Sequence, residues 1–277
     1  MLSVVSNIAS LRAQRHVGLT NSKLAQNMGK LSSGLRINRA SDDAAGLSIS
    51  TKLQAETRGL KQAERNSNDA ISLIQTAEGA LGEVFGVLNR MRELAVQASN
   101  EGTLSSTDRG YIDDEFQQLE AELNRIVNVT EYNGRELING GLSGTNSVDF
   151  QIGMKNTSND RISLELKDVD SSALSLNTNT LAEASSAQAA ISALDTAIQS
   201  ISTQRGSLGA IQNRLTMTIS NLQNMHENLS AANSRIVDVD VASETAEMSR
   251  NQILSQAGIS VLAQANQLPQ AALSLIG

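Results

Sequence analysis

Apolar side chains recur with a seven-residue period between residues 70 and 98. The repeating positions, spaced alternately three and four apart, are Ile74, Ala77, Leu81, Val84, Leu88, Met91, Ala95 and Ala98. This spacing is that of the a and d positions of a coiled coil. Val87 and Leu94 widen the stripe beyond that of a two-stranded coil, so the pattern favours a small helical bundle.

The helical pattern extends back to about Asp42, which predicts one helix of about 57 residues and about 85 Å. The stretch NEGTLSSTD, residues 100–108, holds turn and capping residues and predicts the end of that helix. A second helix is predicted from about Asp108 to Val129. Because the break between them is short, the second helix should fold back antiparallel to the first.

The period changes to two after residue 130. Asn133-Gly134 and residues 139–141 (NGG) are turn signals, and VDFQI (148–152) and ISLEL (162–166) alternate apolar and polar residues. We expect one or two β-hairpins in 130–178.

Helical spacing returns at Leu181 and predicts a third long helix. Its two apolar seams are formed by Ile191, Leu194, Ile198 and Ile201, and by Leu208, Ile211, Leu215, Leu222, Met225, Leu229 and Ile236. The predicted fold is mainly α: a long antiparallel helical coiled-coil bundle with a small β-hairpin region. The chain goes out and comes back, so its N- and C-termini should be paired.

Both ends of the chain lack charge, in residues 1–11 and 251–277, although both are amphipathic. We expect the two ends to bury one apolar stripe against each other, and identical copies of the chain to cover the remaining surface. The candidate polymerisation residues are Val5, Ile8, Leu11, Leu31, Leu35, Ile253, Leu254, Val261, Leu262, Leu268 and Leu273.

Composition agrees with packed helices rather than a compact core of large rings. The chain has 277 residues, with three Phe, two Tyr, no Trp and one Pro. The net charge of −7 argues against nucleic-acid binding, and the absence of Cys excludes disulfides and thiolate chemistry. We expect no cleaved signal peptide at the N-terminus and no membrane span, because no stretch of about 18 apolar residues is unbroken.

No pattern of residues indicates an enzyme, a cofactor or a metal site. His16 and His226 lack ligands at metal-binding spacing, so structural roles are favoured. Asp42 and Asp43, at the start of a predicted helix, fit capping better than a catalytic carboxylate pair. We expect Asp238 and Asp240 to be surface or inter-subunit charges.

Four stretches resemble bacterial flagellin: LSSGLRINRASDDAAGLSIS (31–50), MRELAVQASN (91–100), EYNGREL (131–137) and the whole of 234–277. The resemblance covers both terminal thirds of the chain. It implies a secreted structural subunit that self-assembles into the helical filament of the bacterial flagellum, for motility. The segment between the two arms is short, so the chain resembles a minimal flagellin without large outer domains.

The resemblance also implies how the chain divides. Residues 1–42 and 234–277 would form the N- and C-terminal arms of the filament-core coiled coil. Residues 43–129 and 181–233 would form the helices of the middle domain, and 130–180 the reduced variable region.

Further partners are implied by the resemblance alone. They are an export chaperone and the flagellar type III export apparatus, the filament cap, and the hook–filament junction proteins. The flagellin-sensing Toll-like receptor of a host would recognise the monomer through Arg90, Leu94 and Glu115. The pattern by itself also allows Leu94 to be packed between helices and Arg90 to be solvated.

Two other classes share parts of this pattern. A hook–filament junction subunit would share the terminal helices, and a non-filamentous coiled-coil scaffold would form a closed dimer instead of an open polymer.

Overall fold

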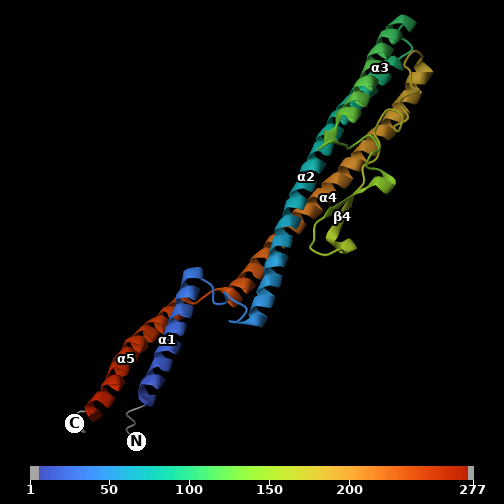
Figure 1. The fold of residues 1–277 in the computed structure, drawn as a ribbon. Helices are drawn as coiled ribbons and strands as arrows, with labels where there is room; N and C mark the ends of the chain where they lie inside the picture. Colours follow the sequence, from blue (N-terminus) through green and yellow to red (C-terminus); the bar gives the residue numbers. More distant parts are fainter. Residues whose placement is uncertain (1–5, 274–277) are drawn as a thin grey trace. The chain divides into compact units, whose positions relative to one another are not determined.

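The structure, a computed structural model, describes residues 6–273, without the side chains of Thr145 and of 268–273 (Figure 1). Its helices are α1 (Ile8–Ser33), α2 (Ala44–Ala98), α3 (Ser106–Val129), α4 (Ala184–Val237) and α5 (Val241–Leu273). Packing divides the chain into two units. The terminal unit is Met1–Thr57 with Glu227–Gly277, and the central unit is Arg58–His226.

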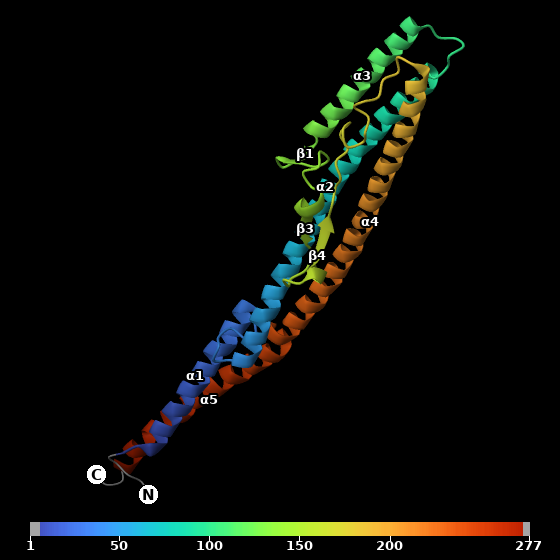
Figure 2. The same ribbon diagram turned by 90° about the vertical axis from the view of Figure 1, so that its right-hand side faces the viewer.

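The central unit is built on the predicted heptad seam. All eight positions of the seam, from Ile74 to Ala98, are completely buried. Side-chain contacts give the helix directions: Arg90 of α2 bonds Glu115 of α3, Arg92 bonds Asp195 of α4, and Gln223 of α4 bonds Glu64. Both α3 and α4 therefore run antiparallel to α2, as the two views show (Figures 1 and 2). The mainly α, coiled-coil character predicted from the period is confirmed.

The predicted break between α2 and α3 is also present. Ser105 and Asp108 form a capping box at the start of α3: each side chain accepts a hydrogen bond from the other's backbone N–H. The Arg109 guanidinium donates to the carbonyl oxygens of Ala98 and Asn100, where α2 has ended. The polar residues of this turn thus satisfy backbone groups that both helix ends leave without a helical partner.

Two antiparallel hairpins follow α3. The first pairs β1 (Glu131–Tyr132) with β2 (Arg135–Glu136) through Asn133 and Gly134, whose φ angles are both positive. That is the geometry of the type I′ turn that Asn-Gly predicts. The second pairs β3 (Val148–Gln151) with β4 (Arg161–Leu164), with Val148 opposite Leu164.

The segment around the hairpins belongs to the core of the central unit. The alternation of β4 places Ile162 and Leu164 in the buried cluster, and Leu166 continues it. The backbone N–H of Leu166 donates to Leu142 O, and that of Val169 donates to Ile138 O. The apolar alternation therefore marks a face buried against the helices, and the polar positions between remain exposed.

In the terminal unit, α1 and α5 pair antiparallel. Asn7 bonds Ala265, Ser10 bonds Asn266, and Ser255 bonds Asn21. At the other end of the pair, Leu35 and Asp238 form a β-bridge. The predicted pairing of the two ends of the chain is confirmed.

Helix starts follow local capping chemistry. The Asp43 carboxylate accepts from the N–H of Gly46 at 2.8 Å, and Asp240 accepts from the N–H groups of Ala242 and Ser243. The predicted capping role is thereby confirmed for Asp43. Asp240 is exposed, as expected, and also caps α5.

One described helix, α2, is long and apolar enough by composition to cross a membrane, with a mean hydropathy of 1.2 over its most apolar window. A core helix passes the same test. Here the buried heptad seam accounts for the apolar composition of α2.

Candidate assembly and recognition surfaces

The paired α1 and α5 helices expose several large aliphatic side chains among polar ones. Among the predicted polymerisation residues, Ile253 is 67% exposed, and Ile8, Leu11, Leu254 and Val261 are each more than half exposed. Leu31, Leu35 and Leu262 are half-buried. Val5, together with the side chains of Leu268 and Leu273, lies outside the described residues. Uncharged aliphatic side chains at this exposure form a surface suited to contact with another protein.

Polar residues are buried where the same two helices meet, beside aliphatic residues such as Val17, Leu24 and Leu31 that are half-buried. Ser10, Asn27 and Glu244 are buried there, and Ala265 is the one buried apolar residue within the described parts of α1 and α5. The expectation that the ends bury an apolar stripe against each other therefore holds only in part: Leu31, Leu35 and Leu262 are half-buried, whereas Ile8, Leu11, Ile253, Leu254 and Val261 are exposed. Met28 is exposed, and its neighbour Asn27 is buried.

The physical reason is close approach. At Gly258 an added Cβ would lie 2.8 Å from Cγ2 of Val17, so the two helices meet where a side chain is absent. Small and hydrogen-bonding residues suit such a contact, whereas a row of leucines would hold the helices farther apart. Several of the larger aliphatic side chains are left on the outside of the pair.

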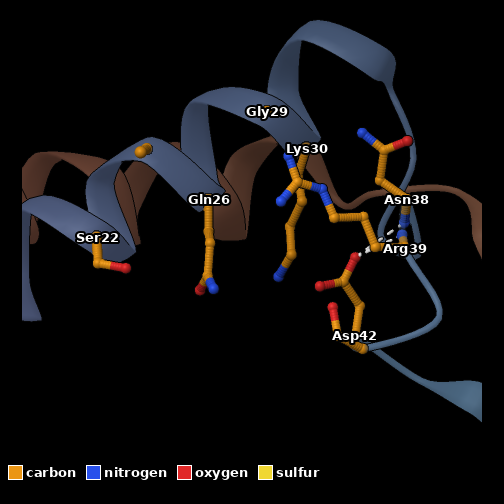
Figure 3. A pocket seen from close by; sticks show the side chains of 9 residues that line it. Ser22, Gln26, Gly29, Lys30, Asn38, Arg39 and Asp42 are labelled. Carbon is orange, nitrogen blue, oxygen red and sulfur yellow. Dashed lines mark hydrogen bonds between the residues drawn. The ribbon is translucent and has the colours of Figure 1, made fainter.

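A shallow hollow of about 240 Å³ lies beside the turn from α1 to α2 (Figure 3). Lys30, Arg39 and Asp42 line it, with the amides of Gln26 and Asn38. The Asp42 carboxylate accepts from the backbone N–H groups of Arg39 and Asn38, which lower its pKa below the ordinary value of 3.8. Its contacts close the turn, so Asp42 is a structural residue.

Arg90, Leu94 and Glu115, the predicted receptor residues, have different environments. The Arg90 guanidinium donates to Glu115 at 2.7 Å and to Glu93 at 3.1 Å, and all three side chains are exposed. The hydrogen bond to Glu115, followed by that to Glu93, raises the pKa of Arg90. Leu94 is only 2% exposed and belongs to the hydrophobic core. The structure thus brings Arg90 and Glu115 together on the surface and packs Leu94 in the hydrophobic core.

No metal-binding cluster of His, Asp or Glu occurs within residues 6–273. His16 lies on α1 and is exposed, and His226 lies near the end of α4. In the part of the chain that the structure describes, neither imidazole is hydrogen-bonded to a carboxylate or hydroxyl that would form a catalytic pair. Within the described residues, the geometry favours surfaces for contact with other protein chains.

Comparison with known proteins agrees with the surfaces. Residues 4–143 match the bacterial flagellin N-terminal helical region, and residues 191–276 match the bacterial flagellin C-terminal helical region. Flagellin of Halalkalibacterium halodurans is 50% identical over 272 residues, covering 98% of each chain. Flagellin of Bacillus subtilis is 46% identical over 302 residues, again covering 98% of each chain.

Solved structures share the fold. The crystal structure of Bacillus cereus flagellin is 35% identical with a TM-score of 0.50, and the match covers 61% of this chain and 94% of that one. A flagellar hook-associated protein from Vibrio parahaemolyticus, described as putative, shares the fold at a TM-score of 0.59 but only 14% identity, with 71% of this chain and 100% of that chain covered. With both arms matched by flagellin models and relatives of nearly equal length, the chain belongs to the bacterial flagellin family and is a structural subunit of the flagellar filament.

Proposed function

We propose that neighbouring copies of this subunit join through the exposed aliphatic side chains of α1 and α5. The observation that supports this is the exposure of Ile8, Leu11, Ile253, Leu254 and Val261 on the paired helices, whose contact buries Ser10, Asn27 and Glu244 instead. Burying one such side chain contributes roughly 1.5–3 kcal/mol. Repeated over many subunits, this contribution favours the polymer over the separate chain.

An open helical polymer follows if the contact is head-to-tail. A heterologous contact whose rotation does not close produces a filament rather than a ring. In such a filament, residues 1–42 and 234–277 form the core, and residues 43–129 and 181–233 form the surrounding helical layer. Residues 130–180 complete the subunit as its reduced variable region.

The subunit functions outside the cell, and we propose that the flagellar type III apparatus exports it unfolded. The charge-free ends, with few buried apolar residues of their own, suit a chain whose arms fold on assembly. An export chaperone, the filament cap and the hook–filament junction proteins are the partners that this route requires. Expression in a strain with a disabled export apparatus should retain the chain inside the cells, and its appearance in the medium at normal levels would contradict the route.

The assembly surface is tested by making it polar. Ile253→Gln with Val261→Gln should prevent filament growth in purified protein while the helix content measured by circular dichroism is retained. Val129→Gln is a matched control, because Val129 is 62% exposed but lies at the end of α3. Filaments from the double variant at the normal yield would exclude these residues from the interface.

We further propose that the monomer is an agonist of the flagellin-sensing Toll-like receptor. Arg90 and Glu115 are exposed and present a guanidinium beside a carboxylate, which is a surface suited to polar recognition. Leu94 supports this surface from below, since it is buried. In this form of the proposal Arg90 and Glu115 contact the receptor and Leu94 positions α2 and α3.

Receptor binding of single variants tests the assignment. Arg90→Ala should weaken binding of the monomer strongly, because it removes the charge and exposes the Glu115 carboxylate without its partner. Arg125→Ala is the control, since Arg125 forms a similar exposed ion pair with Glu122 on α3. Equal binding by the Arg90→Ala protein and the unchanged protein would refute the receptor role.

A further inference from the structure

A buried polar cluster joins α1 to α5 within the terminal unit. Asn27 is 5% exposed and Glu244 is 8% exposed. The side-chain amide of Asn27 donates to Oε1 of Glu244 at 2.5 Å, and that of Asn251 donates to Oδ1 of Asn27 at 3.0 Å. The ammonium of Lys30 lies 3.8 Å from the same carboxylate oxygen. One amide of α1 thus holds two side chains of α5.

The cluster depends on the alignment of the two helices. A displacement of α5 by one turn, about 5.4 Å, would separate Asn27 from Glu244 and from Asn251 together. A buried carboxylate or amide that loses its hydrogen-bond partners is strongly unfavourable, whereas an exposed one is not. The exposed aliphatic residues cannot select the alignment, because they do not lie between the two helices.

An independent contact requires the same alignment. Gly258 of α5 faces Val17 of α1 so closely that a Cβ at residue 258 would meet Cγ2 of Val17 at 2.8 Å. In a displaced pair, a residue with a side chain would stand opposite Val17. Steric fit at Gly258 and hydrogen bonding at Asn27 therefore favour one arrangement.

We propose that the cluster of Asn27, Lys30, Glu244 and Asn251 sets the alignment of α1 with α5. Single buried polar residues fix the register of coiled coils in this way, and the feature they add is specificity rather than stability. This proposal rests on the proposed assembly surface in one respect: the fixed alignment is what holds the outer aliphatic side chains in one arrangement for neighbouring copies.

Disulfide trapping tests the alignment, because the natural chain contains no cysteine. Asn21→Cys with Ser255→Cys reports the native alignment, since Ser255 Oγ lies 2.9 Å from Asn21 Oδ1. Asn21→Cys with Ile259→Cys reports a displacement of about one turn, and Asn21→Cys with Met248→Cys reports about two turns in the other direction. Each full-length protein is oxidised both as soluble chain and after assembly. The disulfide formed within one chain is then read from its mobility on a non-reducing gel and from its mass.

In the otherwise unchanged chain, the native pair should link and the displaced pairs should not. Adding Asn27→Leu and Glu244→Leu should raise the yield of the displaced disulfides about tenfold, which corresponds to loss of a preference of about 1.4 kcal/mol. The matched control adds Gln26→Leu and Glu247→Leu, which are the same substitutions at exposed neighbouring positions and should leave the native pattern unchanged.

A second variant covers the case in which the two leucines abolish pairing. Asn27→Asp keeps the size of the side chain but places a carboxylate against Glu244, and it should also shift linkage from the native to the displaced pairs. The proposal is overturned if both variants keep the native pattern, if the control changes as the test does, or if the native pair never links. If a chain that forms the native disulfide makes no filaments, the proposed assembly surface is contradicted and the proposed alignment is not.

Discussion

At the scale of single residues, Arg90 and Leu94 lie four positions apart on α2 but have opposite environments. The guanidinium is exposed between two carboxylates, and the isobutyl group is inside the core. Side chains four apart share one side of a helix, but they point in slightly different directions, and only Leu94 is buried. A substitution at each position therefore acts by a different route.

Leu94→Ala should destabilise the central unit by roughly 2–5 kcal/mol, because it leaves a cavity among buried side chains. Val96→Ala is the control: Val96 is two positions away and exposed, so its effect should be within about 0.5 kcal/mol. Chemical denaturation followed by circular dichroism measures both. Equal stability of the two variants would show that Leu94 does not support the core.

Ser105→Ala should raise the pKa of Asp108. In the folded chain the Ser105 side chain and then its backbone N–H hold that pKa below the ordinary value of 3.8. A lowered folded-state pKa stabilises the fold above the unfolded pKa, and the contribution is lost as the pH falls through the folded pKa. The variant should therefore show less loss of stability between neutral pH and about pH 3. Carboxyl titration by NMR checks the shift, and an unchanged Asp108 pKa would contradict the capping box.

The sequence did not predict which polar residues are buried between α1 and α5. The heptad of α2 was predicted position by position, because apolar side chains at that spacing have one favourable place. Asn27 and Glu244 are buried. Isolated polar residues are usually exposed, so their burial could not be expected from the sequence. The sequence signal that was available is the apolar stripe of α1, because pairing within one chain does not need to bury all of it.

At the scale of elements, the predicted helices agree closely with those observed. The first long helix was expected to begin near Asp42 and begins at Ala44, and the second was expected near Asp108 and begins at Ser106. Both differences of two residues come from capping contacts, at Asp43 and at Ser105, which depend on side-chain geometry as well as residue type. The turn at Asn133-Gly134 was predicted from its dipeptide, because Asn-Gly strongly favours the two positive φ angles of a type I′ turn.

Two glycines within helices differ in how close the neighbouring atoms lie. Gly258→Ala should weaken the pairing of α1 with α5, because its Cβ would meet Val17. Gly209→Ala in α4, which has nothing within 4 Å, should instead stabilise its helix by about 0.5–1 kcal/mol. Thermal unfolding and the native disulfide of the Asn21/Ser255 pair measure the two effects. If Gly258→Ala raises the melting temperature as Gly209→Ala does, the close approach is absent.

At the scale of the whole molecule, the two units bury different kinds of residue. The central unit has one large hydrophobic cluster drawn from α2, α3, α4 and the hairpin segment. The terminal unit buries Ser10, Asn27 and Glu244 where α1 meets α5, and leaves larger aliphatic side chains half-buried or exposed. One unit is thus complete within a single chain, and the surface of the other calls for neighbouring copies. The sequence predicted the need for those copies from the missing charges, but it did not predict which face each stripe would take.

Deletion of residues 251–277 distinguishes the roles of the two units most directly. The deletion takes most of α5 and, with it, Ile253, Leu254 and Val261 from the proposed assembly surface. The central unit should remain folded, because none of its residues is removed. Its helical signal and cooperative unfolding would be retained in circular dichroism.

Electron microscopy of the full chain and of this deletion, both purified and placed under assembly conditions, tests the central claim. The full chain should form long filaments, and the deletion should form none at the same concentration. Rings or discrete dimers from the full chain, or filaments from the deletion, would contradict assembly through the apolar faces of α1 and α5.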